Sequence, residues 1–148
     1  MQPKLIVMVG ISGSGKSTFA NGLKTSLHAE IVETDAIRAE LFGNAQIQTD
    51  GGRVFAIAKK RVNDLLAQGK NVVIDATSLS VRDRKDWVQI GKTNNAEITA
   101  YVVKVSIEQA KKQNATRERK VPDWVIDKQL TKFTVPTSVE GFDNIVMV

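Results

Sequence analysis

Cysteine is absent from this chain of 148 residues, histidine occurs once, and no apolar run is long enough to span a bilayer. Without cysteine there is no disulfide scaffold, Cys-ligated zinc, iron–sulfur cluster or thiol nucleophile. With His28 as the one histidine, neither a His-based metal site nor a Ser-His-Asp triad is expected. A membrane span needs about 18 apolar residues, so we expect no membrane association. Residues 1–5 lack the pattern of a cleavable secretory signal, which predicts a cytoplasmic protein.

Positive charge is concentrated in one part of the chain. Lys and Arg outnumber Asp and Glu by 21 to 16, for a formal net charge of +5. Residues 82–132 include twelve basic and seven acidic residues, so this stretch accounts for the whole excess. A basic half indicates an anionic partner, such as a nucleotide or a nucleic acid. A solvated helical face is the alternative, and composition alone leaves both open.

Apolar periodicity predicts alternating strands and helices. Leu5–Val9 is a continuous apolar run typical of a buried parallel strand. Further strands are expected at residues 30–33, 71–76, 98–105 and 144–148, and helices at about 16–27, 34–42 with Thr34 as cap, 54–69, 80–92, 106–114 and 122–133, with a loop over 43–52. The pattern predicts one α/β domain over residues 1–148, with a parallel sheet covered by helices on both faces. Trp87 and Trp124 are expected to pack in the core or against another helix rather than to stack on bases.

Residues 10–17, GISGSGKS, match the P-loop (Walker A) pattern, between a predicted strand and a predicted helix. Glycines let consecutive N–H groups point at phosphate oxygens, and the helix N-terminus adds positive potential. Lys16 is expected to reach the β- and γ-phosphates, and the Ser17 hydroxyl to complete a Mg²⁺ shell. The expected phosphate-binding residues are Ser12, Gly13, Ser14, Gly15, Lys16, Ser17 and Thr18. The sequence therefore predicts binding of a purine nucleoside triphosphate with Mg²⁺, and the lack of an Asn-Lys-x-Asp motif argues against a GTPase switch.

Two charged residues directly after the second predicted strand indicate a place for the acceptor. Asp35 and Arg38 are three positions apart, so one face of a helix presents both. A carboxylate there can accept the proton of an attacking hydroxyl, and the arginine can hold an anionic group of the acceptor. A local ion pair at the helix start is the alternative. Asp75 ends the third strand, where it is expected to bind Mg²⁺ through water; an Asp that starts a turn is the alternative.

Residues 117–120, Arg-Glu-Arg-Lys, lie between two predicted helices. Cationic side chains over a bound triphosphate neutralise the charge that develops in phosphoryl transfer. We therefore expect a small lid over about residues 114–121, with Arg117 on the ATP phosphates. A solvated charge run is the alternative, and a shared role for Arg119 stays open.

Four sequence blocks, GISGSGKST, TDAIR, VVIDATSLSVRDRKDW and NATRERKVP, follow one another over nearly all of the chain. Together they resemble the kinase domain of bacteriophage-type 5′-polynucleotide kinases. That family belongs to the P-loop kinase group of zeta-toxin-like AAA ATPases, which also contains small-metabolite kinases. The resemblance implies a three-layer P-loop NTPase fold with a five-stranded sheet in the order 2-3-1-4-5. No fused phosphatase domain is expected within this chain.

On the donor side, the resemblance implies that Lys16 and Ser17 bind the triphosphate and Mg²⁺. Arg117 matches the lid arginine that clamps the β- and γ-phosphates. The third block departs from the bacteriophage enzyme, which reads Ser-Asp-Thr-Asn there and has its Asp one position later than Asp75. Asp75 therefore resembles a residue of the metal shell.

On the acceptor side, the resemblance implies that Asp35 is the general base for the 5′-hydroxyl. Arg38 would contact the 3′-phosphate of the terminal nucleotide and help to order the reacting phosphate. The other positions that match acceptor contacts of the family are Ala76, Thr77 and Val121. The implied catalytic set is Asp35, Lys16, Arg117 and Arg38.

The leading hypothesis is a Mg²⁺-dependent kinase that transfers the γ-phosphate of ATP to the 5′-hydroxyl of DNA or RNA. One alternative is a P-loop kinase of a small hydroxyl metabolite, such as a nucleoside, sugar or sugar nucleotide. Another is a module that binds ATP as a signal and acts through a partner. Both kinase hypotheses use the P-loop, Asp35 and Arg117, so only the acceptor pocket distinguishes one from the other. An ATP-sensing module would need no base on the acceptor side. The preference for ATP over GTP and the oligomeric state stay open.

Overall fold

Five parallel strands form one sheet in the order β2-β3-β1-β4-β5 in the structure, a computed structural model that describes residues 2–43, 51–117 and 120–148. The strands are β1 (Lys4–Val9), β2 (Glu30–Glu33), β3 (Val72–Asp75), β4 (Glu97–Val102) and β5 (Asn144–Met147). β1 is central, with Leu5 opposite Val72 of β3 and Ile98 of β4. The predicted strand order is confirmed.

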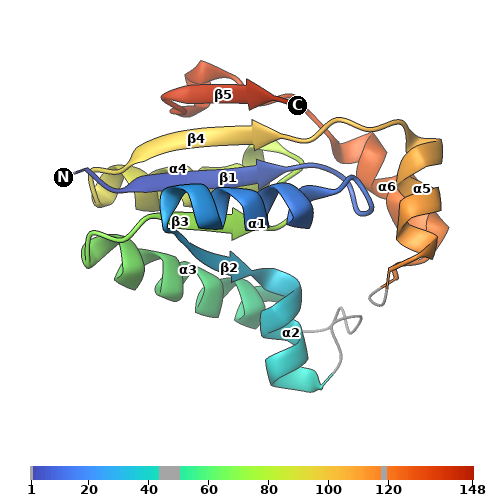
Figure 1. The fold of residues 1–148 in the computed structure, drawn as a ribbon, viewed down its shortest axis with the longest axis horizontal. Helices are drawn as coiled ribbons and strands as arrows, with labels where there is room; N and C mark the ends of the chain where they lie inside the picture. The colour runs from blue at the N-terminus through green and yellow to red at the C-terminus, as the bar shows by residue number, and fades with distance from the viewer. Residues whose placement is uncertain (1, 44–50, 118–119) are drawn as a thin grey trace.

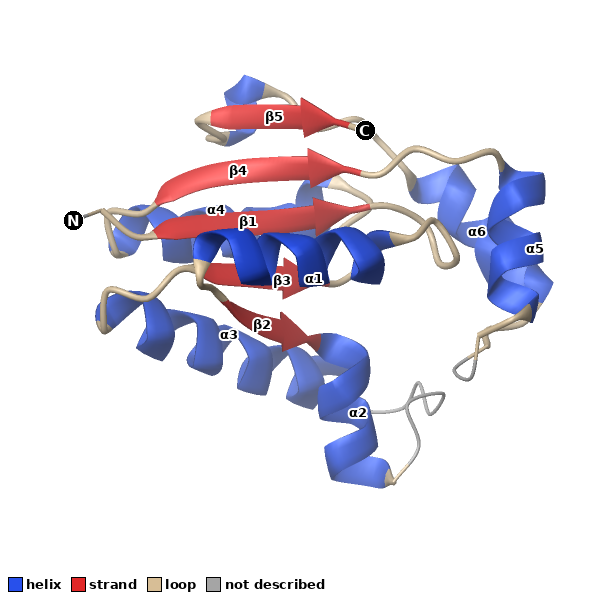
Figure 2. Ribbon diagram, viewed as in Figure 1, coloured by secondary structure: helices blue, strands red, loops and turns tan. Residues whose placement is uncertain are grey.

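Helices cover both faces of the sheet and its carboxyl edge (Figure 1). They are α1 (Lys16–Leu27), α2 (Thr34–Phe42), α3 (Gly51–Ala67), α4 (Val81–Thr93), α5 (Ile107–Ala115) and α6 (Asp123–Lys132). α1 lies on one face and α3 and α4 lie on the other, while α2, α5 and α6 lie beyond the strand ends (Figure 2). This is the expected three-layer P-loop NTPase architecture. Across the described parts of the chain, no helix combines the length and apolar character needed to cross a membrane.

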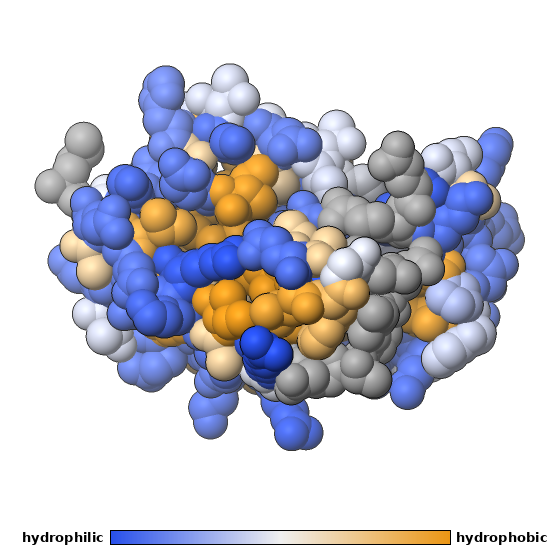
Figure 3. Space-filling view, turned by 90° about the horizontal axis from the view of Figure 1, so that it is seen from below, coloured by the Kyte–Doolittle hydropathy of each residue, from blue (hydrophilic) through white to orange (hydrophobic). Residues whose placement is uncertain are grey.

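The β2 edge of the sheet lies between α1 and α3 (Figure 1). Apolar residues gather in the middle of this side of the molecule, where a row of hydrophilic residues crosses them, and further hydrophilic residues lie around them (Figure 3). α3 contributes one stripe to the core: its buried residues are Val54, Ala58, Val62 and Leu66. Their spacing of four residues explains why this helix lies flat against the sheet.

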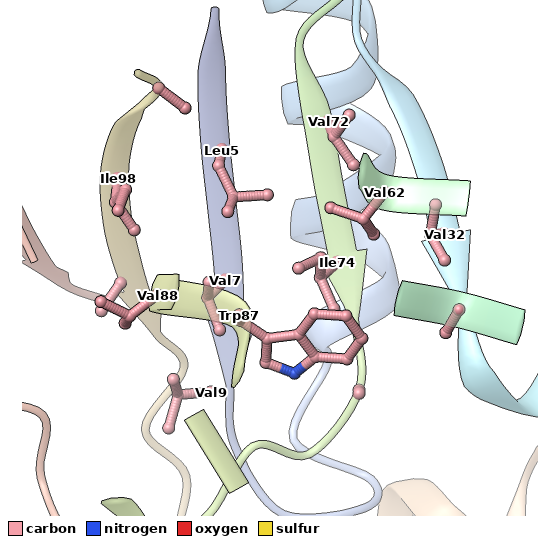
Figure 4. Close-up of a cluster of buried hydrophobic side chains, with 14 of the residues drawn as sticks. Leu5, Val7, Val9, Val32, Val62, Val72, Ile74, Trp87, Val88 and Ile98 are labelled. Carbon is pink, nitrogen blue, oxygen red and sulfur yellow. The ribbon is translucent and has the colours of Figure 1, made fainter. Parts of the chain in front are cut away.

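The core explains why β1 is apolar at every position after Lys4. Leu5, Val7 and Val9 point into the cluster under α3 and α4, whereas Ile6 and Met8 point toward α1. Both faces of the strand are therefore buried. Trp87 of α4 is 1% exposed and lies in the first cluster with Val7 and Ile74 (Figure 4). Its predicted core position is confirmed.

Side-chain caps fix the starts of two of the helices. Ser80 and Asp83 form a reciprocal capping box, in which the Ser80 hydroxyl accepts from the Asp83 N–H at 3.2 Å. The Ser106 hydroxyl accepts from the Gln109 N–H at 3.1 Å. Each bond satisfies an N–H group that the helix leaves unpaired.

Several predicted boundaries differ from the structure. Thr34 does not cap α2: it is the first helical residue and is buried, while the extended Glu33 takes the cap position. The strand expected over 98–105 ends at Val102, where pairing between β4 and β5 ends. The predicted loop at 43–52 is too long, because α3 already begins at Gly51; residues 44–50 lie outside the described residues.

Candidate active site

The phosphate loop joins β1 to α1 at the carboxyl edge of the sheet (Figure 1). Gly13 and Gly15 have φ angles of 81° and 95°, in the left-handed region that favours glycine. A Cβ on Gly13 would also collide with the carbonyl oxygen of Ala110 in α5. Glycine is therefore needed at Gly13 both for the turn and for the close approach to α5.

Lys16 is the first residue of α1, and its side chain is buried. Its ammonium donates a hydrogen bond to the Ile11 carbonyl oxygen at 3.2 Å. Burial lowers the pKa of Lys16; the carboxylate of Asp75 offsets part of this effect and the guanidinium of Arg117 adds to it. A desolvated ammonium is stabilised by a nearby anion. The position therefore favours the binding of phosphate oxygens.

Ser17 and Asp75 meet across the gap between α1 and β3. The Ser17 hydroxyl donates to Oδ2 of Asp75 at 2.9 Å, and Asp75 is buried. Mg²⁺ prefers oxygen ligands and is bound by one or two protein groups together with phosphates and water. Among the described residues, no group of three or more His, Asp and Glu is placed to hold a metal ion. Ser17 and Asp75 therefore fit a Mg²⁺ ion that is bound jointly with a nucleotide.

Asp35 and Arg38 lie in the first turns of α2 and form an ion pair of 3.0 Å between Oδ1 and a terminal guanidinium nitrogen. The Asp35 side chain is 37% exposed, and that of Arg38 is 12% exposed. Nε of Arg38 is buried and has no hydrogen-bond partner within the described residues. The local ion pair that is the alternative to an acceptor site is therefore present, while Nε of Arg38 stays without a partner among the described residues.

The loop after β3 lies beside the phosphate loop. The Gly10 N–H donates to the Thr77 carbonyl oxygen at 3.0 Å, which joins this loop to the phosphate loop. Ser78 has a φ of 47° and is buried, and its hydroxyl lacks a hydrogen-bond partner among residues 2–43, 51–117 and 120–148. A buried hydroxyl without a partner is uncommon in a folded protein.

A buried arginine holds the loop after β3 in place. Arg84 of α4 is 0% exposed and donates to the carbonyl oxygens of Ser78, Leu79 and Thr134, each at 3.0 Å. It also forms a two-bond ion pair with Glu140, at 2.8 and 3.0 Å. One side chain therefore links the loop after β3 to two segments near the C-terminus.

The side chain of Asn114 links the two ends of the predicted lid segment, residues 114–121, by hydrogen bonds. The buried Asn114 side chain donates to the Val121 carbonyl oxygen at 2.7 Å and accepts from the Val121 N–H at 3.1 Å. Arg117 lies between them, and its N–H donates to the Asn114 carbonyl oxygen at 3.2 Å. Arg117 therefore lies just after the end of α5. Glu118 and Arg119 of the predicted charged run lie outside the described residues.

Two neighbouring clefts meet at the phosphate loop. The smaller, of about 240 Å³, is lined by residues of the phosphate loop, α1 and α5; the larger, of about 640 Å³, extends from the loop to α2, α4 and α6. The larger cleft is lined by all of the predicted acceptor-side and metal residues: Ser17, Asp35, Arg38, Asp75, Ala76, Thr77 and Val121. Three residues line both clefts: Lys16, Ser17 and Arg117.

The predicted phosphate-binding residues divide between the clefts. The smaller cleft is lined by Gly13, Gly15, Lys16, Ser17 and Thr18. Ser12 lines the larger cleft, and the buried Ser14 is not among the lining residues of either. The structure therefore brings the predicted site residues together at one edge of the sheet.

A family model described as an AAA domain matches residues 5–136 of the chain. The match includes the phosphate loop and both clefts. The chain belongs to the AAA domain family. The expected membership of an AAA-type P-loop family is confirmed.

This AAA domain is similar to proteins named as polynucleotide kinases. It is 31% identical over 155 residues to a protein of Autographa californica nuclear polyhedrosis virus that carries the name bifunctional polynucleotide kinase/RNA ligase; the match covers 94% of this chain and 22% of the relative. It is 26% identical over 147 residues to a bifunctional polynucleotide phosphatase/kinase of Schizosaccharomyces pombe, covering 96% of this chain and 32% of the relative.

Among solved structures, the AAA domain matches a chain of the Pnkp1/Rnl/Hen1 RNA repair complex with a TM-score of 0.76 and 31% identity. That match covers 88% of this chain and 44% of the other. The chain therefore spans less than half the length of each of these proteins. The expected resemblance to polynucleotide kinase domains is confirmed.

The prediction that Trp124 packs in the core or against another helix is wrong. Trp124 is 64% exposed in the first turn of α6 and lines the larger cleft. α6 lies beyond the sheet rather than on one of its faces (Figure 2), and Ile126 is its one fully covered residue. The helix face toward the cleft is therefore open to solvent.

Two residues that position the site were not recognised from the sequence. Gln129 of α6 accepts from the Ser12 N–H at 2.8 Å and donates to the Ser12 hydroxyl at 2.9 Å, which ties α6 to the phosphate loop. Arg84 supports the loop after β3. Each is a polar residue in an otherwise apolar stripe of its helix. Gln129 lies three positions after Ile126, and Arg84 lies three positions before Trp87. That irregularity is the one signal in the sequence that indicates them.

Proposed function

We propose that this domain is a kinase that transfers the γ-phosphate of ATP to the 5′-hydroxyl of a nucleic-acid strand. The observation that supports this most directly is that Lys16, Ser17 and Arg117 line both clefts. The smaller cleft is suited to the triphosphate and the larger one to the acceptor. Lys16, Ser17 and Arg117 then lie where the phosphoryl group passes from the triphosphate in the smaller cleft to the acceptor in the larger cleft.

The residues of the larger cleft supply what phosphoryl transfer requires, which is positioning and charge neutralisation. Asp35 accepts the proton of the attacking hydroxyl, and Arg38 orients the acceptor beside it. Lys16 and Arg117 neutralise the charge on the transferred group. Mg²⁺, when bound by Ser17 and through water by Asp75, supplies further neutralisation of the triphosphate.

Charge supports an anionic acceptor. Six basic side chains line the larger cleft: Lys16, Arg38, Arg117, Lys120, Lys128 and Lys132. Four acidic side chains also line it: Glu33, Asp35, Asp75 and Asp83. The names of the relatives support a polynucleotide over a small metabolite as the anion.

The test is transfer of label from γ-labelled ATP, with Mg²⁺ present, to acceptors offered in parallel. These are a 5′-hydroxyl oligonucleotide, a nucleoside 3′-monophosphate and a pool of hydroxyl metabolites. We expect label on the oligonucleotide 5′ end, and none after Mg²⁺ is chelated. Label on the metabolite pool alone would assign a small-molecule kinase, and ATP binding without any transfer would assign an ATP-sensing module.

A further inference from the structure

Three residues of α6 line the larger cleft at a spacing of four. They are Trp124, Lys128 and Lys132, and we refer to them as the α6 row. Four helical residues rise about 6 Å, so the row presents an indole and then two ammonium groups at successive turns of one helix face. The catalytic role proposed above uses none of the three.

The α6 row runs between the two segments that carry the predicted acceptor contacts. α6 begins directly after the segment that contains Val121. At its other end, the Thr134 N–H donates to the Leu79 carbonyl oxygen at 2.8 Å, next to the loop with Ala76 and Thr77. Gln129 ties the middle of the helix to the phosphate loop. The row therefore forms a wall of the acceptor cleft and is held at three points.

The side chains of the row are accessible to a ligand. Trp124 is 64% exposed, which is uncommon for so large an apolar side chain. Lys128 and Lys132 form no ion pair or side-chain hydrogen bond with any residue that the structure describes. By contrast, Asp127 on another face of the same helix pairs with Lys111 of α5 at 2.8 Å.

We propose that the α6 row binds the second and third nucleotides of a single-stranded acceptor, with Trp124 stacked on a base and Lys128 and Lys132 on backbone phosphates. An aromatic side chain beside lysines is the combination that binds single strands without regard to sequence. A duplex keeps its base faces covered by neighbouring base pairs, and a small metabolite has neither a second base nor a second phosphate. The assignment rests on the proposed kinase function.

The decisive experiment varies acceptor length. Wild-type protein and Trp124→Ala are compared on a nucleoside 3′-monophosphate and on 5′-hydroxyl single strands of two, three and six nucleotides, by kcat/KM and by direct binding. In the wild type, kcat/KM rises with length up to three nucleotides. In Trp124→Ala, the ratio of kcat/KM on the trinucleotide to that on the mononucleotide falls about 5- to 150-fold, the cost of losing one stacked base. Trp124→Phe restores most of it.

The lysines are tested by salt dependence. Each phosphate contact on a single strand contributes about 0.7 to the slope of log affinity against log salt, so Lys128→Ala/Lys132→Ala lowers that slope by about 1.4. Lys24→Ala/Lys70→Ala removes the same charge from surfaces that do not line the cleft and is the matched control. Leu130→Ala, an exposed apolar residue of α6 away from the cleft, is the control for Trp124→Ala.

An unchanged length ratio in Trp124→Ala would overturn the proposal, as would equal binding of a blunt duplex with the same 5′ end. Direct binding separates this result from a failure of the proposed function. If no acceptor is phosphorylated, the kinase assignment falls, and length-dependent binding that needs Trp124 still supports the row as a single-strand site. If binding is also independent of length, both fail.

Discussion

Arg84→Met removes the buried charge that holds the loop after β3. The guanidinium makes two bonds to Glu140 and three to backbone carbonyl oxygens, and none of it is exposed. Methionine leaves the Glu140 carboxylate, whose side chain is 7% exposed, without this partner. Breaking a buried pair in this way costs about 3–5 kcal/mol. For a domain of this size, we expect the Tm to fall by roughly 6–20 °C.

Thermal and urea unfolding of Arg84→Met measure this loss, with Arg82→Met as the matched control. Arg82 is an exposed arginine in the same helix, so its replacement should change stability by less than about 0.5 kcal/mol. The double variant Arg84→Met/Glu140→Leu should be less destabilised than the two single effects combined, because no charge is left buried alone. If Arg84→Met melts like the Arg82→Met control, the argument from the buried pair is wrong.

Three further substitutions test the proposed catalytic site. Asp35→Asn should keep the thermal stabilisation by Mg²⁺-ATP but lower kcat by about 10²- to 10⁴-fold, since the base is lost and its shape is kept. Arg117→Ala should lower kcat while the Tm stays near that of the wild type, because Arg117 lies in the connection between α5 and α6 and belongs to no core cluster. Gly13→Ala should lower the Tm and abolish stabilisation by ATP, because its Cβ meets the Ala110 carbonyl oxygen.

Matched variants show whether each effect is specific. Glu40→Gln alters an exposed carboxylate on the same helix as Asp35 and should leave kcat unchanged. Lys112→Ala removes an exposed cation from α5 and is the control for Arg117→Ala. Gly22→Ala places a Cβ in open space in the middle of α1 and should raise the Tm slightly. Normal turnover in Asp35→Asn, an unchanged rate in Arg117→Ala, or ATP binding by Gly13→Ala would each contradict the role given to that residue.

Local sequence was sufficient for most of the fold and for the phosphate loop. A strand buried on both faces must be apolar at consecutive positions, and Leu5–Val9 shows this directly. The turn at the phosphate-loop glycines and the caps at Ser80 and Ser106 depend on angles and bonds within a few residues, whereas the close approach of Gly13 to Ala110 is a tertiary contact. Such features are visible in sequence because their physical cause is local. The strand order came from the resemblance to a known family rather than from the pattern.

Only the tertiary structure decided which surface of α6 is open. Trp124 reads as an ordinary apolar helix residue, and its exposure depends on α6 lying beyond the sheet rather than on one of its faces. In the same way, the buried pair of Arg84 and Glu140 and the bond from Gln129 to Ser12 join residues that are 56 and 117 positions apart. The amino-acid sequence by itself determined a phosphate-binding loop in a parallel α/β sheet. The larger cleft depends on contacts between distant segments, whose geometry exists only once the chain has packed.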